Sequence, residues 1–192
     1  MRRTSRATGA LAIAACLLAT SALARGDGGE EPRGPETFKA TAEVEGGRLP
    51  GTHRMEITIH IQSTTPPEVG KQLAGLVASG GQPALQAVLD RYANGSVVFG
   101  ALRYTLNLAV RVPTQRGRRY VIVANRPFGV YEVNTDQDSL AYPFGVIDFE
   151  VDDFGDGEGT LFPRAQITIS EDGTVGVNGY GEPGRLLDVE RQ

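Results

Sequence analysis

The residues best suited to chemistry form a row of carboxylates late in the chain. Asp148, Glu150 and Asp152 alternate with apolar residues, so on a β-strand all three project from one face at a spacing of about 6.6–6.8 Å. Such a row can supply part of a metal site or one half of the acid pair of a glycosidase. The favoured interpretation is the solvent-facing side of an antiparallel strand whose acids pair with arginines across the sheet. The arginines considered for this pairing are Arg103, Arg111 and Arg164.

Two acidic segments, residues 152–158 and 134–138, offer oxygen ligands of the kind that calcium prefers. Their candidate ligands are Asp153, Asp156 and Glu158 in the first segment, and Asp136 and Asp138 in the second. Neither segment has the EF-hand pattern, because the first is flanked by predicted strands and the second lacks the closing glutamate. Acidic loops without a metal are the favoured interpretation, so we expect no cofactor, and calcium is the alternative.

The two histidines, His53 and His60, give little support for catalysis. His60 lies on the polar side of a predicted strand and is retained as a weak catalytic candidate. No G-x-S-x-G nucleophile elbow accompanies it, and the H-E-x-x-H spacing of a zinc protease is absent from the sequence. We therefore leave enzymatic activity open, with a non-catalytic role favoured.

The amino-acid composition limits the classes of partner that the protein is expected to bind. The chain has 192 residues, a net charge of −4, no tryptophan and a single cysteine, Cys16. A negative balance argues against nucleic acid and anionic membranes, which both need a basic surface. A chain that loses Cys16 on processing has no thiol nucleophile, disulfide or cysteine-rich metal site.

The first 24 residues have the pattern of a signal peptide. Arg2, Arg3 and Arg6 form a positive start, residues 7–18 are mostly apolar, and Ala22-Leu23-Ala24 fits a signal peptidase site. The apolar part is shorter than the roughly 20 residues that span a membrane. We expect cleavage after Ala24, an exported periplasmic or secreted protein of bacterial type, and no transmembrane span after cleavage.

A lipid anchor is the alternative route. Ile13-Ala14-Ala15-Cys16 is similar to a bacterial lipobox, in which Cys16 would carry the lipid. The apolar run continues past Cys16, however, whereas a lipobox cysteine normally ends it. Cleavage after Ala24 is therefore favoured over lipidation of Cys16.

The rest of the chain predicts a flexible leader and one domain. Residues 25–36 are rich in Gly, Pro and charge and have no apolar period, so we expect them to be flexible. Residues 37–192 contain no internal repeat and no linker, and they predict a single β-rich domain.

Apolar alternation predicts about eight β-strands in this domain. They cover residues 38–44, 55–61, 102–112, 120–124, 146–151, 160–170, 174–180 and 186–189. Asp156-Gly157 and Asp172-Gly173 are expected to form hairpin turns, and Pro163 is expected to mark an edge or a bulge. These features predict a mainly antiparallel sandwich or open barrel.

A helical hairpin interrupts the strands. Thr64-Thr65-Pro66-Pro67-Glu68 is typical of a helix start with a hydroxyl cap, and Gly80-Gly81 followed by Pro83 separates the two helices. Apolar residues then recur at helical spacing. They are Val69, Leu73, Leu76 and Val77 in the first helix, and Leu85, Val88, Leu89 and Tyr92 in the second. We expect this stripe to pack on one face of the sheet.

Several aromatic and glycine motifs resemble those of a group of short secreted bacterial proteins of unassigned function. The motifs are Arg126-Pro127, Tyr142-Pro143-Phe144-Gly145, Gly157-Glu158-Gly159-Thr160-Leu161, Asn178-Gly179-Tyr180-Gly181 and Leu186-Leu187-Asp188-Val189. The resemblance implies a shared fold and export. It transfers no active site.

The favoured hypothesis is a non-catalytic binding or envelope-associated module, with a small molecule or an envelope protein as its partner. A curved sheet would offer a pocket for such a ligand. The alternatives are a hydrolase that uses the strand carboxylates and a structural module stabilised by calcium.

Overall fold

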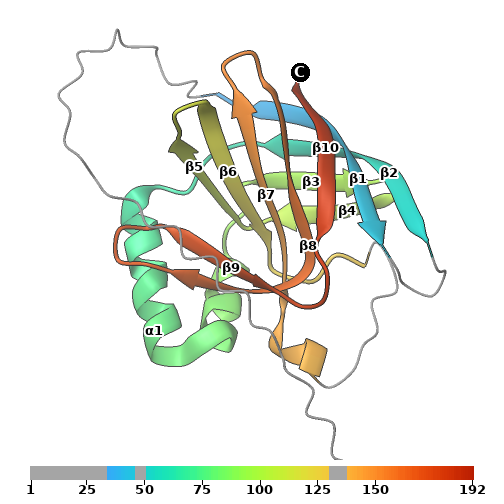
Figure 1. Cartoon of the computed structure of the whole chain (residues 1–192). Helices are drawn as coiled ribbons and strands as arrows, with labels where there is room; N and C mark the ends of the chain where they lie inside the picture. The colour runs from blue at the N-terminus through green and yellow to red at the C-terminus, as the bar shows by residue number, and fades with distance from the viewer. Residues whose placement is uncertain (1–33, 46–50, 130–137) are drawn as a thin grey trace, which may run out of the picture. The chain divides into compact units, whose positions relative to one another are not determined.

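The computed structural model describes residues 34–45, 51–129 and 138–192, which lie within one compact unit, Pro32–Gln192. In these residues ten strands form one antiparallel sheet in the order β4-β3-β2-β1-β10-β8-β7-β6-β5, with β9 paired to β8 outside this path (Figure 1). The strands are β1 (Glu36–Glu45), β2 (Thr52–Ile61), β3 (Gly95–Phe99), β4 (Leu102–Leu106), β5 (Leu108–Pro113), β6 (Gly117–Ala124), β7 (Phe144–Asp152), β8 (Asp156–Ile169), β9 (Val175–Gly179) and β10 (Gly184–Arg191). The predicted mainly antiparallel β fold is confirmed.

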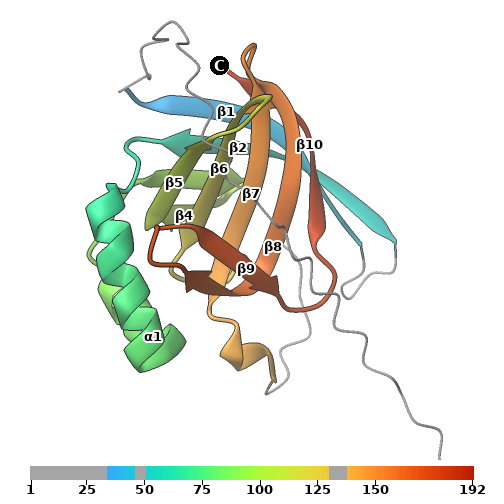
Figure 2. The same ribbon diagram turned by 60° about the vertical axis from the view of Figure 1, so that its left-hand side comes forward.

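The sheet curls into a nearly closed barrel, because its two end strands, β4 and β5, follow one another along the chain (Figures 1 and 2). Between them the Asn107 amide donates to the carbonyl of Val123 in β6, at 2.8 Å. The free edge of β5 is covered by Thr65, whose amide donates to the Ala109 carbonyl at 2.7 Å and whose hydroxyl accepts from the Ala109 amide. Thr65 is therefore an edge partner for β5 and not the predicted helix cap.

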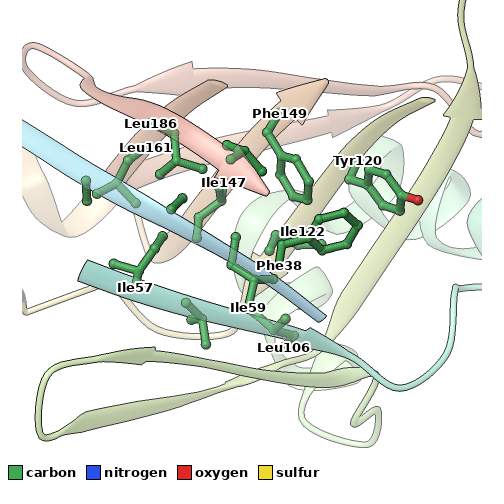
Figure 3. Packing of buried hydrophobic residues seen from close by; sticks show 14 of the residues in the cluster. Phe38, Ile57, Ile59, Leu106, Tyr120, Ile122, Ile147, Phe149, Leu161 and Leu186 are labelled. Atoms are coloured by element: carbon green, nitrogen blue, oxygen red, sulfur yellow. The ribbon is translucent and has the colours of Figure 1, made fainter. Parts of the chain in front are cut away.

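Alternate side chains of the strands other than β9 point into the barrel and fill it (Figure 3). The rings of Phe38, Tyr120 and Phe149 contact one another, with centroids 5.0–5.1 Å apart. All three are at most 1% exposed. The barrel interior is thus a packed hydrophobic core, as in other small barrels. A binding pocket enclosed by the curved sheet, as the sequence suggested, is not what these residues form.

The outer face of the sheet carries a second core beneath α1 (Pro67–Leu89). The helix is broken at Gly81, where φ is 65° and ψ is −160°, which gives the two predicted arms. All eight residues of the predicted apolar stripe pack into this core, together with side chains of β5 to β9. No helix in the described part of the chain is long and apolar enough to cross a membrane.

The long strand predicted over residues 102–112 is wrong in one respect, because it is interrupted at Asn107. Tyr104 and Leu106 face the barrel interior, whereas Leu108 packs in the outer core beneath α1. After the interruption, the residues that faced outward in β4 are followed in β5 by residues of the same parity that face inward. Arg111 therefore points into the barrel instead of lying on the solvent side. Asn107 itself is only 7% exposed.

Three further local predictions can be compared with the strands. The short strand β3 (Gly95–Phe99) is not among the eight strands that the alternation predicts. Pro163 does lie at an irregularity, where the register between β7 and β8 shifts. The predicted turn at Asp156-Gly157 is wrong, because both residues belong to β8 and the positive φ is that of Gly155, at 97°.

Candidate functional site

The predicted carboxylate row lies on the outer face of β7. Ile147, Phe149 and Val151 face the barrel interior and are at most 2% exposed. The alternating side chains of Asp148, Glu150 and Asp152 are partly exposed on the opposite face. The strand geometry that the sequence predicted is therefore present, and the neighbouring strands decide what the row can do.

Arg119 on β6 is the partner of Asp148. Its Nε and Nη2 donate to the two carboxylate oxygens of Asp148 at 2.8 and 2.5 Å. These hydrogen bonds raise the pKa of Arg119 above its ordinary value. Both oxygens of Asp148 are thus occupied by a guanidinium in the bidentate arrangement that such pairs favour.

The arginines that the sequence proposed for this pairing lie elsewhere. Arg103 donates to the Ser96 hydroxyl, and Arg164 donates to the Ser139 carbonyl. Arg111 is inside the barrel, 3.5 Å from the carboxylate of Glu36. The expectation failed because it depended on which arginines share a face with Asp148, and the strand register decides that.

Thr114, in the turn between β5 and β6, holds Glu150. Its hydroxyl donates to the Glu150 carboxylate at 2.7 Å and accepts from the backbone amides of Arg116 and Gly117. The turn therefore fixes one oxygen of Glu150. Nothing in the sequence pattern singled out Thr114.

Asp152 caps the hairpin between β7 and β8. One of its carboxylate oxygens accepts hydrogen bonds from the backbone amides of Phe154, Gly155 and Asp156, at 2.9, 2.9 and 3.0 Å. An aspartate that bonds to amides a few residues further on is a common turn device. Asp152 is therefore a structural residue of the turn, with Phe154 at the tip 87% exposed.

The facing strand β8 completes a groove. Glu158 lies directly opposite Glu150 in the register, and Thr160 lies opposite Asp148. The groove is open to solvent and has a volume of about 540 Å³. We call it the acidic groove, and it is lined by Arg116, Arg119, Asp148, Phe149, Glu150, Val151, Asp152, Asp156, Gly157, Glu158 and Thr160. Five acids against two arginines give these residues a net charge of −3.

His60 does not belong to the acidic groove. It lies on β2, where its Nδ1 is 3.0 Å from the Thr37 hydroxyl of β1. The residues that line the groove come from β6, β7, β8 and the turns between them. The structure therefore does not bring the histidine and the carboxylate row together.

The predicted metal ligands give no assembled calcium site in the residues described. Asp153 and Asp156 lie at the hairpin, Glu158 lies on β8, and Asp138 begins the short helix η1 (Asp138–Ala141). Asp136 lies outside the described residues. Within those ranges, no three His, Cys, Asp or Glu side chains are placed so that they could hold one metal ion. Calcium binding stays a prediction.

A second polar cluster lies inside the barrel at one end of β1. Glu36 is 7% exposed and accepts hydrogen bonds from the Tyr120 hydroxyl at 3.0 and 3.1 Å, beside the guanidinium of Arg111. Burial, followed by the charge of Glu36, raises the pKa of Tyr120 to about 12. Because the surrounding protein buries this cluster, it contributes to the stability of the fold more directly than to the binding of a ligand.

Comparison of the chain with protein-family models, with curated proteins and with solved structures finds no match. The resemblance noted in the sequence therefore stays a prediction, as do export and cleavage after Ala24, which concern residues outside the described ranges. The groups that line the acidic groove are what a functional assignment can be built on.

Proposed function

We propose that this chain is an exported, non-catalytic binding module that holds a basic partner in the acidic groove on the outer face of β6, β7 and β8. The observation that carries the proposal is that the carboxylates of the row already accept hydrogen bonds from the protein. Asp148, Glu150 and Asp152 already accept hydrogen bonds from Arg119, Thr114 and the turn backbone. A row held in this way keeps its position but is poorly suited to passing protons to a substrate.

Charge favours a positively charged partner. The lining residues carry a net charge of −3, and Asp156 and Glu158 on the β8 side are exposed. Charge complementarity steers association and selects between partners. The packed interior of the barrel also leaves the outer surface as the natural place for binding.

Phe154 supplies an apolar contact beside this charge. It is 87% exposed at the tip of the hairpin whose two strands line the groove. Exposed aromatic residues are frequent anchors in protein interfaces. A basic segment of an envelope protein, with an apolar residue next to its charges, fits the combination better than a small uncharged molecule.

An oligolysine peptide is a direct probe. We expect the purified protein to bind it at low salt and to lose affinity as salt is added. The double variant D156N/E158Q removes two exposed charges from the groove and should bind about threefold to tenfold more weakly. The matched control E171Q/E182Q removes two exposed charges outside the groove and should bind as the unchanged protein does. Equal binding by both variants would contradict the proposal.

A hydrolase is the second candidate, because Glu150 and Glu158 are directly opposite one another. Side chains at such positions have Cβ atoms about 4.5–5.5 Å apart, so two glutamates there can bring their carboxyl groups to the separation of about 5–5.5 Å found in retaining glycosidases. This function requires turnover of aryl glycosides that is abolished by both E150Q and E158Q. Turnover that survives E158Q, or that is absent in the unchanged protein, would reject it.

A further inference from the structure

A second groove lies where the end of α1 meets the junction of β4 and β5. It has a volume of about 620 Å³, in the range of small-molecule sites. We call it the corner groove, and it is lined by Pro83, Gln86, Ala87, Asp90, Tyr92, Ala93, Thr105, Asn107, Asn125 and Arg126. It shares no lining residue with the acidic groove.

The floor of the corner groove is held by Asn107. Its Nδ2 donates to the carbonyls of Leu89 and Tyr92 at 3.1 and 2.8 Å, and its Oδ1 accepts from the Asn125 amide at 2.9 Å. Gln86 on α1 donates from its Nε2 to the Asn125 carbonyl at 3.2 Å. Helix and sheet are thus joined by side-chain hydrogen bonds, so the groove is formed before any ligand arrives.

Two opposite charges line this groove without pairing with each other. Asp90 is exposed at the C-terminal cap of α1, and its Oδ1 accepts a short hydrogen bond from the Asn125 Nδ2. Arg126 is exposed, with its guanidinium 4.7 Å from the centre of the Tyr104 ring and one N–H donated to the Arg103 carbonyl. A guanidinium has five N–H donors, so Arg126 keeps others for a ligand.

Apart from Arg126, the residues that line the corner groove include no basic side chain. The last turn of α1 contains no basic residue, although a helix C-terminus favours positive charge. The Asn125 Oδ1 is buried at this place and has no donor among the described residues, which is unfavourable for a buried acceptor. For this oxygen to accept from a ligand N–H, the Asn125 side chain would have to turn and its Nδ2 would give up Asp90 to the ligand.

We propose that the corner groove binds a zwitterion of the α-amino acid class. Its ammonium group would lie at Asp90, with Asn125 as a second acceptor, and its carboxylate would lie at Arg126. Pro83, Ala87 and Tyr92 give the side chain of the ligand a mainly apolar wall. This inference goes beyond the binding of a basic partner, because it concerns other residues and another class of ligand.

Calorimetric titration of the purified protein with the free L-amino acids tests the proposal. We expect at least one of them to bind, and the N-acetylated and the α-amidated forms of that amino acid to bind about tenfold more weakly or not at all. Absence of binding by all the free amino acids, or equal binding of the blocked forms, would overturn the proposal.

Variants locate the site and separate it from the acidic groove. D90N keeps a side-chain oxygen for Asn125 but removes the charge, and R126Q removes the positive partner, so each should weaken binding about tenfold. R126K keeps the charge and should retain most of the affinity. E171Q, an exposed change outside both grooves, is the control and should bind normally. Unchanged affinity in D90N would overturn the assignment, whatever the outcome of the oligolysine experiment.

Discussion

Two ion pairs on the two faces of the barrel wall illustrate how burial changes the role of the same chemistry. Inside, Arg111 lies 3.5 Å from Glu36, and their side chains are 12% and 6% exposed. Outside, Arg119 binds Asp148 at 2.5 Å, with side chains 42% and 20% exposed. The outer pair has the shorter distance, yet we expect the stability of the fold to depend more on the inner pair.

The difference follows from solvent. A buried charge that loses its partner stays unpaired in a poorly solvating environment, whereas water and salt compensate an exposed one. We therefore expect changes at the inner pair to act on folding, and changes at the outer pair to act on what the acidic groove binds.

The largest effect should come from breaking the inner pair. Arg111→Met leaves the Glu36 carboxylate buried without its guanidinium partner, which should lower the free energy of unfolding by about 3–5 kcal/mol. Denaturant titration measures this loss. The double variant E36Q/R111M removes the unpaired charge and should recover part of the stability. A loss below about 1 kcal/mol in Arg111→Met would show that the inner pair resembles the outer one.

Alkaline pH should destabilise the protein through the same buried cluster, by ionising Tyr120. The pKa of Tyr120 is raised from 10 to about 12, so the folded state disfavours its ionisation. The stabilising contribution is therefore complete below pH 10 and is lost as pH rises through about 12, at a cost of about 2–3 kcal/mol. Denaturant titrations at a series of pH values measure it. The variant Y120F should show a smaller loss over this interval, and an equal loss would rule Tyr120 out as the cause.

A substitution that disturbs the packing of β8 against β7 should have an intermediate effect on stability. Gly159 on β8 lies against β7, and a Cβ at this position would be 2.5 Å from the Phe149 Cβ and from the Asp148 carbonyl oxygen. Gly159→Ala should therefore lower stability by about 1–3 kcal/mol. Gly75→Ala on α1 is the matched control, because a Cβ there meets nothing within 4 Å and alanine favours the helix. Thermal melting should move in opposite directions for the two variants.

The smallest effect on stability should come from the outer pair. Arg119→Gln should change the free energy of unfolding by no more than about 1 kcal/mol. It makes the acidic groove more negative, so binding of oligolysine should become tighter. Weaker binding in Arg119→Gln would mean that the guanidinium contacts the partner, which would contradict the structural role given to Arg119 here.

Much of this architecture could be predicted from periodicity alone. The alternation of the strands and the eight-residue helical stripe are confirmed because the apolar residues that define them pack into one of the two cores. Leu108 shows the limit of the method. Both faces of β5 are buried, one in the barrel and one beneath α1, so apolar spacing does not reveal that the strand turns over at Asn107.

The site was predicted in part. The shared face of Asp148, Glu150 and Asp152 follows from their spacing, but the partners Arg119 and Thr114 come from other strands and turns. Their identity depends on register, which is set by the turn geometry. Centring the hairpin on Phe154 instead of on Asp156-Gly157 would have placed Glu158 opposite Glu150.

The interruption at Asn107 has a consequence for how the molecule opens. Its backbone and side-chain amide connect β6, the end of α1 and the segment between β4 and β5, so the same hydrogen bonds hold the barrel core and the helix-covered core together. Breaking these hydrogen bonds would expose both cores in the same event. Native-state hydrogen exchange should then report α1 and β6 as members of a single cooperative unit, rather than a helix that detaches from a barrel that persists.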